Sequence, residues 1–378
     1  MKAAMISWEF PPQFTGGLGI HCQEIVQALT SNGVLIDFYL PAFKTENFEV
    51  PAGATLHHVK TKIINSSYTY HGDEIWEAVK EFKTKLEDTF NPKEINIIHA
   101  HDWMGVFAAT TIAKKYNIPL VWTVHSTEYD RAAGMPVHPG ILAIEQEAIE
   151  NVNHTITVSN RMKQNLVLHY NANPDNITVI YNGIDPARFE ELRMRDYENM
   201  DGYILFLGRI TGQKGPDDFL EAARIIITDR KDAHFKIAGD GDLLNSLRRR
   251  AKSWKISNHV EFAGSVFDNQ LLDCYKNALL FVLPAVSEPF GITVLEAMAS
   301  GLPTIITSTT GAGEVVSHVI KVEPNQPKEL AQAIITLLNN PQHRKTLGEE
   351  GAKEVLQLSW QHIGKQTKLL YLQLLRTL

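Results

Sequence analysis

Two glutamates eight positions apart carry the clearest chemical signal in this 378-residue chain. Glu288 and Glu296 lie on either side of Gly291, after an apolar run and at the start of a helical pattern. Carboxylates accept hydrogen bonds from hydroxyl groups, and the N–H groups at a helix start attract phosphate. The segment could therefore bind a ribose and a second sugar on either side of a phosphate. Further candidate contacts come from the turn between the glutamates: Phe290, Gly291, Ile292 and Thr293.

Two cations follow another apolar run. Arg209 comes one glycine after this run, and Lys214 precedes a glycine and a helical pattern. At the carboxyl end of a strand, a guanidinium and an ammonium group at this spacing suit the non-bridging oxygens of a diphosphate. The simpler alternative is a pair of surface cations without a ligand.

A glycine-rich turn follows the first apolar run. Gly16-Gly17-Leu18 stands at the start of a helical pattern, where small residues let backbone N–H groups approach a pyrophosphate. A dinucleotide-binding turn would continue to a glycine or alanine, but Cys22 occupies that position. Asp37 stands where such a site would have its ribose-binding acid. A nicotinamide dinucleotide site and a purely structural turn are therefore alternatives to phosphate binding.

Histidines end two further apolar runs. His99, His101 and Asp102 close one run, and His125 closes the next. Because the carboxyl ends of parallel strands lie at one edge of a sheet, these side chains are expected at a shared ligand site. The alternative for His99 and His101 is a structural role as buried or helix-capping histidines. No helical H-E-x-x-H and no C-x-x-C pattern accompanies them, so no metal site is expected.

Short apolar runs alternate with segments of helical period, which is typical of parallel sheets covered by helices. Before a polar stretch at 185–202, the runs are 2–7, 35–40, 95–99, 120–124, 154–158 and 176–181. After it, they are 203–207, 234–238, 260–263, 278–283, 303–307 and 319–322. The pattern predicts two doubly wound α/β domains, at 1–195 and 196–360, and a last helix at about 361–378. An apolar stripe from Leu369 to Leu375 indicates that this helix docks on another element.

Composition and charge exclude several classes of protein. Hydrophobic residues make up 44% and charged residues 21% of the chain, which is ordinary for a globular protein and excludes a fibrous or disordered one. The net charge of -7 argues against a nucleic-acid partner. With only two cysteines, no disulfide framework is expected. No stretch has the length of a transmembrane segment or the pattern of a signal peptide, so a cytoplasmic location is expected.

Taken together, the motifs resemble those of retaining, nucleotide-sugar-dependent glycosyltransferases of the glycogen synthase and sucrose synthase type. The resemblance extends over nearly the entire chain and rests on Gly16-Gly17-Leu18, His101-Asp102-Trp103, Val124-His125, Tyr181-Asn182-Gly183-Ile184-Asp185, Gly208-Arg209 with Lys214, Gly239-Asp240-Gly241, Glu288 to Glu296, and Ser359-Trp360. It implies the GT-B fold, in which two Rossmann-like domains face each other and a final helix crosses back onto the first domain.

The resemblance also implies roles for the candidate residues. These are diphosphate binding by Arg209 and Lys214, sugar binding by Glu288, ribose binding by Glu296, and contact with the reacting sugar by His125 and Asp102. The reaction would move a hexose, with glucose as the first expectation, from a UDP-, ADP- or GDP-sugar to a hydroxyl of an α-glucan, another saccharide or a small molecule. Neither a cofactor nor a metal ion is expected.

Three positions depart from the family pattern. Phe14 stands where bacterial glycogen and starch synthases have a lysine, and Phe290 replaces a frequent cysteine or glycine. Glu314 follows Gly313 where the family often has a proline, so no role is predicted for Glu314. Three other functions stay open from the sequence: a sugar-nucleotide epimerase on the same fold, an NAD-type oxidoreductase, and a catalytically silent glycan-binding protein.

Overall fold

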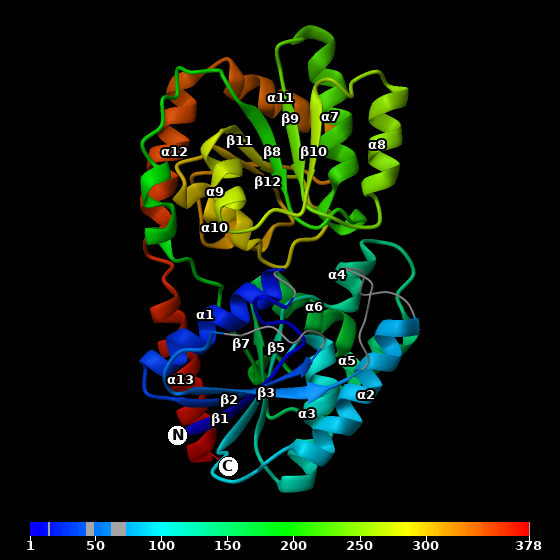
Figure 1. The fold of residues 1–378 in the computed structure, drawn as a ribbon, viewed down its shortest axis with the longest axis vertical. Helices are drawn as coiled ribbons and strands as arrows, with labels where there is room; N and C mark the ends of the chain where they lie inside the picture. Colours follow the sequence, from blue (N-terminus) through cyan, green and yellow to red (C-terminus); the bar gives the residue numbers. More distant parts are fainter. Residues whose placement is uncertain (14–15, 43–48, 62–72, 378) are drawn as a thin grey trace. The chain divides into compact units, whose positions relative to one another are not determined.

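The chain folds into two compact units, each a parallel sheet covered by helices (Figure 1). The computed structural model describes residues 1–13, 16–42, 49–61 and 73–377, so Phe14 lies outside the described residues. Unit 1 consists of Met1–Asn182 together with Trp360–Leu378, and unit 2 of Gly183–Ser359. No helix within the described ranges has the length and apolar character needed to cross a membrane.

Unit 1 is built on a parallel sheet that has seven strands within the described residues. In the order of the sheet they are β3 (Ala54–Lys60), β2 (Leu35–Ala42), β1 (Lys2–Ile6), β4 (Ile97–His101), β5 (Leu120–Val124), β6 (His154–Thr157) and β7 (Ile177–Val179). The helices are α1 (Gly17–Ser31), α2 (Asp73–Thr89), α3 (Asp102–Tyr116), α4 (Glu128–Ala132), α5 (Pro139–Asn151), α6 (Asn160–Tyr170), the 3-10 turn η1 (Pro174–Asn176) and α13 (Trp360–Thr377). Strands β4 and β5 are buried along their whole length, as expected for central parallel strands.

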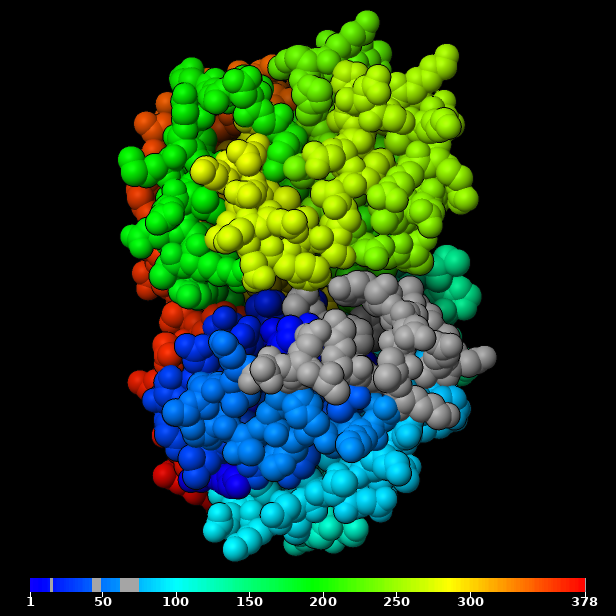
Figure 2. Space-filling view, viewed as in Figure 1, coloured from blue at the N-terminus to red at the C-terminus, as the bar shows by residue number. Residues whose placement is uncertain are grey.

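Unit 2 is built on a second parallel sheet, with six strands. In sheet order they are β10 (Val260–Gly264), β9 (Phe235–Ala238), β8 (Tyr203–Leu207), β11 (Ala278–Leu283), β12 (Thr304–Thr307) and β13 (Ile320–Val322). The helical segments are η2 (Pro186–Leu192), η3 (Gly212–Lys214), α7 (Pro216–Asp229), α8 (Leu244–Ser253), α9 (Asp268–Lys276), α10 (Ile292–Ala299), η4 (Gly311–Glu314), α11 (Pro327–Leu338) and α12 (Pro341–Val355). In the space-filling view, the visible face of unit 2 is mostly green to yellow, which are the colours of segments up to α9 (Figure 2).

In both units the strand order reverses beside the first strand. Strand β1 lies between β2 and β4, and β8 lies between β9 and β11. At such a point the connections leave the sheet in opposite directions, so the carboxyl ends of the two central strands flank a crevice where ligands bind. The sequence prediction of two doubly wound α/β domains is therefore confirmed.

The division between the units differs in detail from the expected one. The segment 183–195, which the sequence pattern placed with the first domain, groups with unit 2. Phe189 is buried there against Tyr275, with ring centroids 5.9 Å apart. Arg193 and Arg195 donate hydrogen bonds to backbone carbonyl oxygens at the end of α10, over 3.1 Å and 2.8 Å. These arginines gave the segment the polar composition of a linker, although they anchor it to unit 2.

Strand β3 and helix α2 were not among the elements expected from the sequence. Strand β3 is an edge strand in which only Val59 is buried, so its residues lack the apolar run that marks the central strands. Its histidines, His57 and His58, further weaken that apolar signal. Edge strands with polar residues are a common way to avoid unwanted pairing with other chains.

The last helix belongs to unit 1 and packs against α1 (Figure 1). Its buried face is formed by Trp360, Ile363, Gly364, Thr367, Leu370 and Tyr371. The expected stripe from Leu369 to Leu375 is therefore only partly correct, and Leu369 is 56% exposed. The closest approach is at Gly364, where a β-carbon would lie 2.6 Å from the β-carbon of Ala28.

A substitution of Gly364→Ala tests the close contact between α13 and α1. Alanine favours an exposed helix by about 1 kcal/mol over glycine, but here its methyl group would collide with Ala28. Overpacking of this kind costs about 1–3 kcal/mol, so we expect a lower free energy of unfolding in chemical denaturation. The matched control is Gln366→Ala on the exposed face of the same helix. A Gly364→Ala protein at least as stable as this control would contradict the packing described.

Candidate functional site

In unit 2 the predicted cations and one predicted carboxylate lie on the two turns that flank the reversal of strand order. Arg209 and Lys214 follow β8, and Glu288 follows β11. The ammonium group of Lys214 forms an ion pair with the carboxylate of Glu288, and the two side chains are only 15% and 7% exposed. The structure thus brings together charges of both signs, which suits a ligand with an anionic part and hydroxyl groups.

Close backbone contacts fix the turn that carries Arg209. Gly239 has φ 136°, and a β-carbon there would lie 1.9 Å from the carbonyl oxygen of Gly208. Gly215 has φ 67°, and a β-carbon there would lie 2.0 Å from the carbonyl oxygen of Pro284. A side chain at either position would push the turns apart. The Gly-Asp-Gly motif therefore acts as a support for the turn after β8.

The turn that carries Glu288 is held by the loop after β12. The amide of Gly311 donates a hydrogen bond to the carbonyl oxygen of Glu288 over 2.9 Å, and the amide of Ala312 donates to Phe290 over 2.7 Å. Phe290 is buried, with 2% of its surface exposed. The two backbone hydrogen bonds therefore fix the conformation of this turn.

Glu296 lies on α10, which begins after Gly291 in a left-handed conformation with φ 97°. The hydroxyl of Tyr275 donates to Glu296 Oε2 over 2.7 Å, and burial raises the pKa of the Glu296 carboxyl. Ile292 and Thr293 form the first turn of α10, where N–H groups have no partner within the helix. Tyr275 was not predicted, because its contact with Glu296 depends on how α9 packs and not on local spacing.

In unit 1 the glycine-rich turn meets a carboxylate of the chain itself. Helix α1 begins after Gly16, and the amide of Gly19 donates to Glu9 Oε2 over 3.1 Å. Glu9 is buried, with 3% of its surface exposed. The sequence analysis did not predict a role for this carboxylate. It accepts a hydrogen bond from one of the N–H groups at the start of α1. The amides of Gly17 and Leu18 come before it in the same turn.

The histidines after β4 and β5 are joined by a third histidine from α1. His101 Nδ1 lies 3.2 Å from His125 Nε2, so the two strand ends share one site as the sheet position predicts. The ring of His21 lies 5.3 Å from that of His101 and 4.4 Å from that of His125, between centroids. His21 Nδ1 also donates to Asn182 Oδ1 over 2.7 Å. We call His21, His101 and His125 the histidine cluster.

Burial keeps the histidine cluster uncharged. It lowers the pKa of His21 to about 4 and holds the pKa values of His101 and His125 well below the usual range, with neighbouring histidines adding to the effect. One ring nitrogen from each of the three lies within 4.8 Å of the others, so the cluster could hold a metal ion. No metal site was predicted because the sequence lacks local metal-binding motifs such as a helical H-E-x-x-H. The three histidines come from three separate elements, so no local motif could reveal them.

His99 has a structural role, as the alternative from the sequence proposed. Its Nδ1 lies 2.5 Å from the hydroxyl of Tyr371 on α13, and its Nε2 lies 2.6 Å from Thr123 Oγ1. Burial lowers the pKa of His99 to about 3, so the ring is a neutral link between α13 and two strands. Its ring also lies beside that of His101, with centroids 4.3 Å apart.

A buried network of charges fixes the turn after β5. Asp102, in the left-handed region with φ 55°, accepts a hydrogen bond from the amide of Ser126 over 3.3 Å. Arg131 donates to the carbonyl oxygen of Ser126 over 2.6 Å. The same guanidinium pairs with Glu128 over 3.2 Å and with Glu145 over 2.5 Å. Because these groups compensate one another, the turn keeps its shape at low solvent exposure.

Asp37 does not support the dinucleotide alternative. It is the third residue of β2, near the amino end of the strand, whereas ligands of such sheets bind at the carboxyl ends. Its carboxylate pairs with Lys2 over 2.8 Å and with His57 over 3.4 Å.

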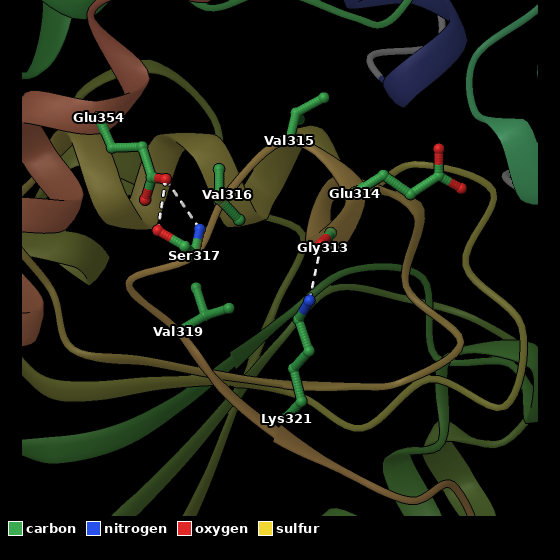
Figure 3. A pocket seen from close by; sticks show the side chains of 8 residues that line it. All are labelled: Gly313, Glu314, Val315, Val316, Ser317, Val319, Lys321 and Glu354. Atoms are coloured by element: carbon green, nitrogen blue, oxygen red, sulfur yellow. Dashed lines mark hydrogen bonds between the residues drawn. The ribbon is translucent and has the colours of Figure 1, made fainter.

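A pocket of unit 2 lies beside the loop after β12, the loop whose amides bind the turn of Glu288 (Figure 3). It is lined by Gly313, Glu314, Val315, Val316, Ser317, Val319, Lys321 and Glu354. Glu354 of α12 accepts hydrogen bonds from the amide and the hydroxyl of Ser317, each over 2.8 Å. Lys321 donates to the carbonyl oxygen of Gly313 over 2.7 Å. These contacts stabilise the loop, and the residues predicted to bind a ligand do not line this pocket.

Comparison with known proteins agrees with this arrangement. The family model Glycosyltransferase Family 4 matches residues 15–188, and Glycosyl transferases group 1 matches residues 189–354. A glycosyltransferase of Methanocaldococcus jannaschii is 31% identical, with 98% of each chain covered. A glycogen synthase of Mycobacterium tuberculosis is 27% identical over 98% of this chain and 94% of its own.

Solved structures show the same fold. A sucrose-phosphate synthase from Thermosynechococcus elongatus superposes with a TM-score of 0.83 at 20% identity, covering 100% of both chains. The Anabaena protein HepE, solved in complex with UDP-glucose, gives a TM-score of 0.74 at 16% identity, again over 100% of both chains. The chain therefore belongs to the group 1 and family 4 glycosyltransferases and is an enzyme with the GT-B fold, as its motifs indicated.

Proposed function

We propose that this glycosyltransferase is a retaining hexosyltransferase. It moves a hexose, with glucose as the preferred candidate, from a nucleoside diphosphate sugar to a hydroxyl of a saccharide or small-molecule acceptor. The observation that carries the proposal is the buried ion pair between Lys214, on the turn after β8 that also bears Arg209, and Glu288, on the turn after β11. The UDP-glucose bound to the similar HepE structure supports a donor of this class.

The ion pair of Lys214 and Glu288 can exchange partners with a bound donor. Lys214 and Glu288 neutralise each other in the structure. A bound diphosphate supplies another anionic partner for Lys214 and Arg209, which leaves the Glu288 carboxylate to accept hydrogen bonds from the sugar hydroxyls. Glu296 binds the ribose, and the N–H groups of the first turn of α10 point at phosphate. The two cations then stabilise the charge that develops on the leaving diphosphate.

The histidine chemistry of unit 1 favours retention. His125 and Asp102 are proposed to contact the reacting sugar, with Gly16, Gly17 and Leu18 at the neighbouring turn. A general base works best when its pKa is near the working pH, but burial holds the pKa of His125 well below the usual range. His125 is therefore a hydrogen-bonding group and a poor base. The leaving phosphate then takes the proton of the acceptor hydroxyl, which attacks from the same face.

The first prediction concerns the two cations. Nucleotide sugars are screened for diphosphate release, without and then with candidate acceptors, and the best pair is used to assay Lys214→Ala and Arg209→Ala. Each charge-assisted contact supplies on the order of 3 kcal/mol, so each variant should lose about a hundredfold or more in turnover. Lys231→Ala, an exposed lysine of unit 2, is the control. Over half of wild-type activity in both variants would show that the cations do not hold the diphosphate.

The second prediction separates binding from stability at Glu296. Burial raises the pKa of this carboxyl, so the stability it contributes is present at acid pH and is lost as the pH rises through the raised pKa. Glutamine does not ionise, so Glu296→Gln avoids this loss of stability at high pH. The variant should be at least as stable as the wild type at pH 7. Hydrogen bonds to a charged group are worth about 1.5–3 kcal/mol, so nucleotide affinity by calorimetry should fall about tenfold or more.

The control for Glu296→Gln is Glu329→Gln, an exposed glutamate on α11. It should leave nucleotide affinity unchanged. Unchanged affinity for UDP, ADP and GDP in Glu296→Gln would remove this residue from the ribose site.

The third prediction is that transfer does not need a divalent metal ion. Lys214 and Arg209 supply the positive charge that such an ion gives to a leaving diphosphate in other enzymes. Activity should persist in excess EDTA, measured as diphosphate release. Loss of activity in chelator that returns on addition of manganese would disprove metal independence.

The fourth prediction concerns stereochemistry. An α-linked donor should give an α-linked product, because the lowered pKa of His125 makes this residue a poor base for inversion. The product is examined early in the reaction by proton NMR, through the coupling constant at the new glycosidic carbon. A β-linked product would reassign His125 or Asp102 as a true base and end the retaining mechanism.

A further inference from the structure

We propose that the histidine cluster binds a transition-metal ion of the zinc type, and that an ion bound there inhibits transfer. The cluster joins His21 of α1, His101 at the end of β4 and His125 after β5, all in unit 1. One ring nitrogen from each lies within 4.8 Å of the others. Zinc binds histidine nitrogens at about 2.0–2.1 Å, which places tetrahedral ligands about 3.4 Å apart. His101 Nδ1 and His125 Nε2 are 3.2 Å apart and share a hydrogen bond, which an ion between the rings would replace with two metal–nitrogen bonds.

Two ring nitrogens in the cluster have no hydrogen-bond partner. Within the described part of the chain, His21 Nε2 and His101 Nε2 are buried and unpaired. Buried polar atoms are almost always satisfied, so the unpaired His21 Nε2 points to a missing ligand, whereas His101 Nε2 carries the ring proton when His101 Nδ1 binds the ion. A hydroxyl or amide from a neighbouring side chain would normally fill such a role.

The tautomer of His21, with the proton on Nδ1, is one that metal-binding histidines commonly have. Its Nδ1 donates to the side-chain oxygen of Asn182 over 2.7 Å, which leaves the lone pair on the unpaired Nε2. Metal-binding histidines commonly donate their second N–H to an oxygen in this way, which fixes both the ring orientation and the tautomer. Asn182 thus orients His21 toward the other two rings.

The chemistry of the donor set decides which ions fit. Three neutral imidazoles suit zinc, cobalt, nickel and copper, whereas magnesium, calcium and manganese prefer oxygen ligands. Asp102, next to His101 in the chain, supplies a nearby negative charge for a dication. His125 is partly exposed, so an ion can reach the cluster from solvent. Three protein ligands also leave a coordination position open for water.

Inhibition follows from the use of His125, and this step rests on the proposed function. An imidazole bound to a metal ion through Nε2 is held in the cluster by that bond and is no longer free to turn toward the donor sugar. The ion therefore competes with productive binding of the sugar, although transfer itself needs no metal. EDTA should leave the activity of clean enzyme unchanged and restore that of zinc-loaded enzyme.

The binding test uses the full chain, stripped of metal and without donor. Zinc is titrated by calorimetry, and Co²⁺ serves as a visible probe because nitrogen ligation in a tetrahedral site gives intense absorption bands. We expect one ion per chain, no binding of Mg²⁺, and a loss of affinity of about tenfold or more in His21→Asn and in His101→Asn. His169→Asn, which removes an exposed histidine outside the cluster, should bind like the wild type.

Two results would overturn the site. One is the absence of stoichiometric binding to the wild-type chain, and the other is unchanged affinity in both cluster variants. Circular dichroism checks that the variants are folded. X-ray absorption at the zinc edge of the wild-type complex gives a second measurement that needs no variant, and it should show three imidazole ligands. A spectrum dominated by oxygen ligands would exclude the cluster.

The inhibition test measures diphosphate release with added zinc, relative to the activity of each protein without zinc. Wild-type turnover should fall and recover with EDTA, and His21→Asn should need about tenfold more zinc for the same effect. Zinc that binds without lowering turnover would overturn the inhibitory part alone. Failure to find turnover with any nucleotide sugar would instead overturn the proposed function, while the calorimetric result on the metal site would stand.

Discussion

Parallel strands put all their carboxyl ends at one edge of a sheet, and the reversal of strand order decides which of those ends can receive a ligand. In unit 2 this constraint sets the turn after β8 beside the turn after β11, so that Lys214 reaches Glu288. In unit 1 it sets the turn after β1 beside the end of β4, where His21 meets His101. The candidate groups of both units depend on the same topological feature, although their chemistry differs.

The two units handle buried charge in different ways. Lys214 and Glu288 form a simple pair, in which each group can exchange its partner for part of a ligand. Arg131 is held by two carboxylates and a backbone oxygen, so removal of any one partner leaves the others in place. The first arrangement suits binding and the second suits support of a loop. The histidine cluster avoids charge altogether, because its burial favours neutral rings.

The sequence predicted the features that local spacing determines. The doubly wound sheets and the adjacency of His101 and His125 follow from apolar runs and the polar residues that end them. The contacts of Glu9, His21 and Tyr275 could not be predicted in this way, because each joins elements whose packing is set by the whole unit. The buried face of α13 was misplaced for the same reason: Gly364 and Thr367 pack inward, and neither is apolar enough to mark a stripe.

Helix α13 completes a unit that began hundreds of residues earlier in the chain. His99 and Tyr371, which share a hydrogen bond, are separated by 272 positions, and the whole of unit 2 lies between them in sequence. A ribosome makes the chain from its amino end. His99 of β4 can therefore bind Tyr371 of α13 only after unit 2 has been synthesised. Unit 2 is continuous in sequence and has all of its residues available first. Vectorial synthesis therefore allows the second unit to finish folding before the first.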